Sequence, residues 1–136
     1  MKHEALTEQL IGIFYSVYND LGHGFVESVY QRAFAVVLGE RGLAFQEQMP
    51  IEVFFHGVMV GEFRADLVAE SSVLVELKAV NSLDHAHEKQ TLNYLRSTNL
   101  EVGLLLNFGP RPQVRRFVMD NELKTGKSSS AVASSA

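Results

Sequence analysis

The sequence contains no cysteine, no run of eighteen apolar residues and no excess of positive charge. Without cysteine the chain can form neither disulfides nor thiolate zinc sites, so a reducing compartment, the cytoplasm, is the expected location. The missing apolar run predicts no membrane span, and the amino terminus resembles no secretory signal. The chain has 12 Lys and Arg residues and 16 Asp and Glu residues, and its formal charge of -4 excludes bulk attraction for a phosphate backbone. Any contact with nucleic acid must be local.

The length of 136 residues and the hydrophobic content of 46% suit one globular domain with its own core. We expect this domain to occupy residues 1–124. From residue 125 the sequence is rich in Ser and Ala, and it has too little bulky apolar surface to offset the entropy of ordering. Residues 125–136 are therefore expected to form a flexible tail.

The order of apolar patterns predicts a mixed sheet with helices packed on it. Helical spacing covers residues 7–21, 25–41 and 83–98, with Gly22 and Gly42 as stops and Ser82 or Asp84 as the cap of the third helix. Strands are expected at 45–55 and 58–64 around a His56-Gly57 turn, then around Asp66, and at 73–80, 102–108 and 114–118. The first two helices are expected to bury Leu10, Phe14, Val17, Tyr18 and Leu21, and Val26, Val29, Tyr30, Ala33 and Val37.

Two charges stand inside the apolar strand at 73–80, where charges should be scarce. Side chains alternate across a strand, so Glu76 and Lys78 project from one face while Leu77 projects from the other. If Asp66 lies on the adjacent strand, the two carboxylates could converge on one hard divalent cation, with the Leu77 carbonyl as a further oxygen ligand. Lys78 would then orient or deprotonate water. Taken alone, a surface Glu76–Lys78 ion pair on an edge strand would be the more common explanation.

Further segments place the acidic cluster in a known context. The chain resembles the GxxExxY protein family, which is similar to a compact branch of the PD-(D/E)XK nuclease superfamily. The resemblance covers residues 10–118 and implies a restriction-endonuclease-like α/β (α+β) fold with an αβββαβ core, in agreement with the element order above. The segments that carry it are residues 24–30 (GFVESVY), 63–66 (FRAD), 75–79 (VELKA) and 90–95 (QTLNYL).

The resemblance implies that Asp66 and Glu76 are metal ligands and that Lys78 is the catalytic lysine. Glu27 would be an acid on the second helix that completes the site, either as a direct ligand or through a water; alone, it could equally be a solvated helix residue. Gln90 would hold a phosphate oxygen or Lys78. The superfamily's proline before the acid is replaced here by Ala65. That proline shapes a bend and supplies no ligand, so the proposed chemistry is unaffected.

The two motif tyrosines, Tyr30 and Tyr94, are more safely interpreted as packing residues with a polar tip. Tyr94 and Gln90 are four apart and therefore share a helix face. His85 and His87 are two apart on a helix and make poor zinc partners.

His23 and His56 resemble polar loop residues more than catalysts. A basic segment near the carboxyl end could meet a nucleic-acid backbone, or it could be a solvated strand edge that discourages aggregation. Its members are Arg111, Arg115, Arg116, Lys124 and Lys127.

These observations predict a Mg²⁺- or Mn²⁺-dependent nuclease that hydrolyses phosphodiester bonds of DNA or RNA. The alternative is a catalytically silent nuclease-fold module that binds nucleic acid or a protein partner, since a fold does not guarantee an activity. A domain this small has no obvious recognition insert. A homodimer, in which two sites face one duplex, is therefore a further hypothesis.

Overall fold

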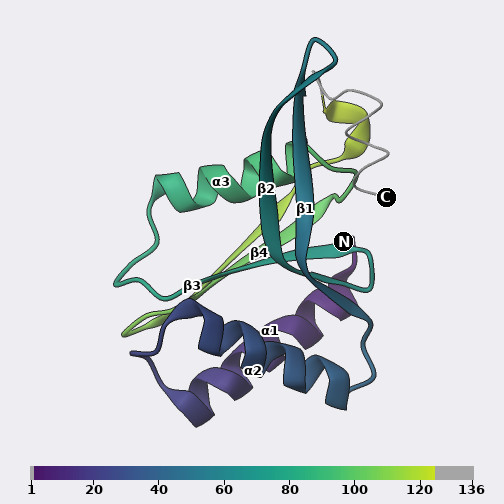
Figure 1. Cartoon of the computed structure of the whole chain (residues 1–136). Helices are drawn as coiled ribbons and strands as arrows, with labels where there is room; N and C mark the ends of the chain where they lie inside the picture. The colour runs from purple at the N-terminus through teal and green to yellow at the C-terminus, as the bar shows by residue number, and fades with distance from the viewer. Residues whose placement is uncertain (1, 125–136) are drawn as a thin grey trace.

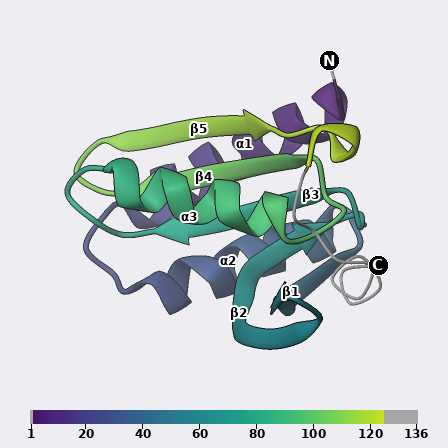
Figure 2. The ribbon, with the colours of Figure 1, turned by 90° about the horizontal axis from the view of Figure 1, so that it is seen from above.

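A five-stranded mixed sheet is covered by two helices on one face and one helix on the other (Figures 1 and 2). The structure is a computed structural model that describes residues 2–124, so the predicted tail at 125–136 lies outside the described residues. The elements are α1 (Glu4–Leu21), α2 (Glu27–Glu40), β1 (Phe45–Phe55), β2 (Val58–Ala69), β3 (Val73–Lys78), α3 (His85–Arg96), β4 (Val102–Phe108), β5 (Pro112–Val118) and the short 3-10 helix η1 (Asn121–Leu123).

The strands lie in the order β1-β2-β3-β4-β5. Only β3 and β4 are parallel, and α3 forms the crossover between them. This arrangement confirms the predicted fold class.

Two apolar layers sandwich the centre of the sheet. Val75 and Leu77 of β3 pack toward α1 and α2, whereas Leu74 packs in the layer beneath α3. Because β3 and β4 are covered on both faces, their sequences are almost continuously apolar. Glu76 is on the same side of β3 as Leu74, so the predicted charged face looks toward α3.

The β1–β2 hairpin extends beyond the other strands as an arm (Figure 1). β1 pairs with β2 along nearly its whole length, but β2 pairs with β3 only from Leu67 to Ala69. The arm turns at His56 and Gly57, both with positive φ, as in the two-residue turns that match strand twist. The predicted turn is confirmed.

Two expectations about these elements are wrong. β2 runs unbroken through Asp66, so the predicted break after Arg64 does not occur, because the hairpin arm and the sheet strand are one continuous ladder.

The predicted face of α2 is also rotated. Tyr30, Phe34 and Leu38 are buried, Val26 is 68% exposed, and Val29, Ala33 and Val37 are half-buried. The larger side chains share an i, i+4, i+8 stripe, and burying them removes more apolar area from water. On α1, Leu21 is likewise exposed, whereas Ile13 is buried.

No helix within residues 2–124 combines the length and the apolar character that crossing a membrane requires.

Candidate active site

Asp66 and Glu76 lie side by side where β2 and β3 part. The ladder between these strands ends at the pair Leu67 and Val75, one step before Asp66 would face Glu76. Instead, the Asp66 backbone N–H donates to the Glu76 carboxylate at 3.2 Å, and the Leu77 N–H donates to the Asp66 carboxylate at 2.8 Å. Each carboxylate thus accepts from a backbone N–H of the opposite strand.

The environment of Glu76 excludes the alternative of a surface ion pair on an edge strand. β3 is the central strand, and Glu76 is only 3% exposed. Burial raises the pKa of Glu76 well above its ordinary value, the Asp66 carboxylate raises it further, and the Lys78 ammonium lowers it by a smaller amount. Two acids in this arrangement repel each other unless a proton or a cation compensates.

Lys78 is the last residue of β3 and is half-buried on the same face as Glu76. The structure thus brings together the predicted set of Asp66, Glu76 and Lys78 around the point where the strands part. An oxygen donor set of two carboxylates fits Mg²⁺ or Mn²⁺, which take few protein ligands. The role of the Leu77 carbonyl as a further ligand stays a prediction.

Helix α3 borders this cluster through Gln90 and Tyr94. The Gln90 amide donates to the Tyr94 hydroxyl at 3.1 Å, which confirms their shared helix face. Burial raises the pKa of Tyr94, and the negative charges of Glu76 and Asp66 raise it further. Gln90 is half-buried, and Tyr94 is buried with a hydrogen-bonded tip.

Glu27 is the first residue of α2, and its side chain is exposed. Among residues 2–124, no three His, Cys, Asp or Glu side chains gather in a geometry that could hold a metal ion. The role of Glu27, as a direct ligand or through a water, stays a prediction.

Tyr30, the last residue of the motif that contains Glu27, fixes the start of α2. Its hydroxyl donates to the Gly22 carbonyl at 2.6 Å and accepts from the Phe25 N–H at 3.2 Å. Its ring stacks on Phe108 with centroids 4.1 Å apart. This confirms that Tyr30 packs with a bonded polar tip, and it shows how the turn before Glu27 is tied to the sheet.

Sequence reasoning missed a distortion of β1 next to Asp66. Gln48 has a φ of 52° and no ladder partner, although Glu47 and Met49 on either side pair with Leu67 and Ala65. The Gln48 side chain bonds to Gln31 at 2.7 Å. Asp66 is therefore flanked by interrupted pairing on both sides. A positive φ at glutamine leaves no signal in the sequence.

Asn107 is a second residue that sequence reasoning missed. It is fully buried on β4 beside Lys78, accepts from the Val80 N–H and donates to the Val80 carbonyl, both at 3.0 Å. Its amide also donates to Gln113 at 2.9 Å. These bonds hold the chain that leaves β3 directly after Lys78. The available signal was a lone amide in an otherwise apolar central strand.

The other candidates are engaged elsewhere. His87 and Asp84 form the capping box of α3, with both bonds at 3.1 Å, so Asp84 is the cap and His87 has a structural role. His56 lies in the hairpin turn, stacked on Phe55, and His23 is exposed before α2.

Three residues of the basic segment near the carboxyl end contact other parts of the chain. Arg115 lies 3.7 Å from Glu88, Arg116 donates to the Lys2 carbonyl, and Lys124 donates to two carbonyls near residue 100. Arg111 is exposed, and Lys127 lies outside the described residues.

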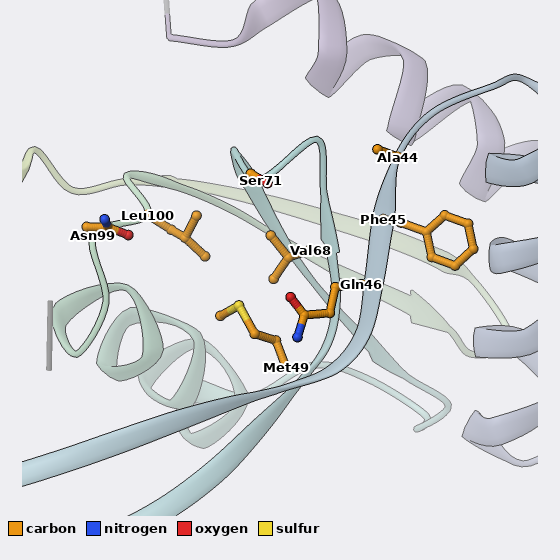
Figure 3. Close-up of a pocket in the computed structure, with 8 residues that line it drawn as sticks. All are labelled: Ala44, Phe45, Gln46, Met49, Val68, Ser71, Asn99 and Leu100. Atoms are coloured by element: carbon orange, nitrogen blue, oxygen red, sulfur yellow. The ribbon is translucent and has the colours of Figure 1, made fainter. Parts of the chain in front are cut away.

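A hollow of about 370 Å³ at the start of β1 contains none of the catalytic candidates (Figure 3). Val68, Leu100 and Met49 converge on it, whereas the ring of Phe45 points away. Its lining, which also includes Ala44, Gln46, Ser71 and Asn99, has no charged side chain.

The chain is similar to a solved structure and to the sequences of a known family. The crystal structure titled SSO0001 is similar over 68% of this chain, with 20% identity and a TM-score of 0.49; the chain spans about half (50%) of that protein. A comparison with curated proteins gives no significant match. The sequence profile of the PD-(D/E)XK nuclease superfamily matches residues 4–117, most of the chain. The protein therefore belongs to the PD-(D/E)XK nuclease superfamily.

Proposed function

We propose that the protein is a Mg²⁺- or Mn²⁺-dependent nuclease of the GxxExxY branch that hydrolyses phosphodiester bonds of DNA or RNA. The observation that carries the proposal is the pair of Asp66 and Glu76, whose carboxylates each accept from a backbone N–H of the other strand. Lys78 lies on the same face of β3 as Glu76. A buried carboxylate beside a half-buried one destabilises a fold unless a cation compensates their charges, and a protein without such a cation has no evident need for the pair.

In this proposal Asp66 and Glu76 would hold the metal ion, with the Leu77 carbonyl as a further ligand. Bound there, the ion would supply Lewis-acid stabilisation of charge on a phosphate oxygen. Lys78 orients the attacking water and stabilises the charge that develops as the new oxygen–phosphorus bond forms and the leaving oxygen departs. Gln90 would hold a phosphate oxygen or Lys78, and Glu27 would complete the site as a direct ligand or through a water.

Further parts of the proposal concern the setting of the reaction. The absence of cysteine favours a reducing compartment such as the cytoplasm. A homodimer would give this short chain a larger surface for nucleic acid.

The experiment is a cleavage panel of single-stranded, duplex and structured DNA and RNA with Mn²⁺ or Mg²⁺. Lys78→Met should lower cleavage by about 10²- to 10⁴-fold and keep the metal-induced rise in melting temperature. Asp66→Ala should lose both. A wild-type response to metal that survives in Asp66→Ala would refute the site.

One observation favours the second candidate, a catalytically silent module that binds nucleic acid or a protein partner. Glu27 is exposed and apart from the acidic pair in the described part of the chain. Metal binding without any Lys78-dependent cleavage across the panel would select this alternative.

A further inference from the structure

A groove of about 320 Å³ lies between the hairpin arm and α3, next to the acidic pair. The arm contributes Val53 and Phe63, and α3 contributes Lys89, Gln90, Asn93 and Tyr94. No Asp or Glu lines it. In a chain of net negative charge, this groove is therefore a place that an anionic strand can enter without repulsion from its walls.

The groove and the proposed catalytic cluster share Gln90 and Tyr94. The charges of Asp66 and Glu76 act on the Tyr94 hydroxyl, and the Gln90 amide bonds to that hydroxyl. A ligand that fills the groove would therefore lie directly beside the proposed position of the scissile phosphate.

Each wall of the groove has an aromatic ring, Phe63 on the arm and Tyr94 on α3, and α3 also contributes the ammonium group of Lys89. Phe63 is 47% exposed although it is a large apolar residue, and its ring lies 5.8 Å from the Tyr94 ring at an angle of 39°. Lys89 is exposed and forms no salt bridge within residues 2–124. Aromatic faces beside a free ammonium suit nucleic acid, in which planar bases alternate with phosphates.

We propose that this groove binds an unpaired base of a single-stranded nucleic acid, with the base stacked on Phe63 and a neighbouring phosphate next to Lys89. The inference rests on the proposed function and specifies its substrate as single-stranded. A base inside a duplex is stacked on its neighbours and cannot enter a groove between a hairpin and a helix without being extruded. Stacking tolerates any sequence, because every base has a π face.

The first test uses Phe63→Trp, which would be the sole tryptophan of a chain that has none. The probes are a 15-nucleotide oligothymidylate and an abasic oligonucleotide of equal length, added in EDTA so that no cleavage occurs. Stacking should quench the tryptophan with the oligothymidylate and not with the abasic strand. The matched control is Phe55→Trp, on the same arm outside the groove lining and 62% exposed, which should show no quenching. Equal quenching of both tryptophans, or equal quenching by both probes, would overturn the proposal.

The second test measures anisotropy with a labelled oligothymidylate. Phe63→Ala should weaken binding by roughly 5- to 100-fold. Phe63→Tyr should keep the affinity within about threefold of the wild type, because the tyrosine ring can also stack on a base. Circular dichroism checks that the half-exposed position tolerates both changes. Unchanged binding by Phe63→Ala would refute the groove even if Asp66-dependent cleavage persists. Conversely, base-dependent quenching without cleavage would support the groove and count against hydrolysis.

Discussion

Replacing Glu76 by Gln should stabilise the metal-free protein at neutral pH, although the residue is at the centre of the proposed site. Glu76 is nearly inaccessible, and its pKa is raised first by burial and then by Asp66. The substitution removes the charge but keeps a side-chain oxygen that can accept from the Asp66 N–H, and the new amide can donate to the Asp66 carboxylate.

The sign and size follow from proton linkage. A carboxyl whose pKa is higher in the folded than in the unfolded state favours folding while both states hold the proton. That contribution is lost as the pH rises from the unfolded pKa, about 4.5, to the raised folded pKa. In this window the wild type should lose up to about 1.4 kcal/mol of unfolding free energy per pH unit relative to Glu76→Gln. For a domain of this size that is about 5 °C in melting temperature per pH unit.

The assay is thermal unfolding in EDTA from pH 4.5 to 8.5, compared among the wild type, Glu76→Gln and the exposed control Glu8→Gln on α1. The gap between wild type and Glu76→Gln should open with rising pH and then stay constant, whereas Glu8→Gln should follow the wild type. Saturating Mg²⁺, at about 100 times its dissociation constant, should add about 2.7 kcal/mol to the wild type and nothing to Glu76→Gln.

Two results would refute this reasoning. Parallel pH profiles of wild type and Glu76→Gln would mean that the carboxyl has no raised pKa in the fold. Equal stabilisation of the two proteins by Mg²⁺ would mean that Glu76 does not hold the ion.

Three further substitutions test the elements that position the site. Tyr30→Phe should cost about 1–2 kcal/mol in urea unfolding, since the Gly22 carbonyl loses its donor while the ring stack remains; no loss would count against this anchor. Asp84→Ala should cost about 1 kcal/mol and lower the helical circular dichroism slightly, whereas Asp84→Asn should recover most of the cap. Gly109→Ala should cost about 1–3 kcal/mol in thermal unfolding, because the added Cβ would clash with the Val80 carbonyl oxygen; a neutral result would mean that this backbone yields easily.

The fold could be predicted because periodicity and turn chemistry agree along most of the chain. β1 and β4 begin and end where the sequence predicts, and the His56-Gly57 turn specifies the hairpin. The prediction of a break before Asp66 was wrong because the two halves of β2 lie in different environments. Its first half is an exposed arm with charged residues, and its second half is a buried strand, so its composition changes while its backbone pairing does not.

The acidic pair could be predicted because a buried strand seldom contains charges. The sequence also placed Glu76 and Lys78 on one face correctly. It could not show that Gln48 adopts a positive φ beside Asp66, because glutamine has no preference for that conformation, and the Gln31 partner of its side chain is on α2, distant in the sequence. Nor could it select the buried stripe of α2, which has two apolar stripes and is oriented by packing of Phe34 and Leu38.

The end of the ladder between β2 and β3 explains how two neighbouring strands can each present an acid at the same place. Pairing stops at Leu67 and Val75, and beyond that point the Asp66 and Leu77 N–H groups donate to carboxylates. Each carboxylate accepts from a backbone N–H of the opposite strand. These bonds to the sheet restrict the rotation of the two acidic side chains and fix the positions of their carboxylates. The remaining lone pairs stay available for a cation. Regular pairing of β2 and β3 beyond Leu67 and Val75 would be expected to stabilise the strands and remove the site. Such a trade-off between stability and function is expected at functional sites.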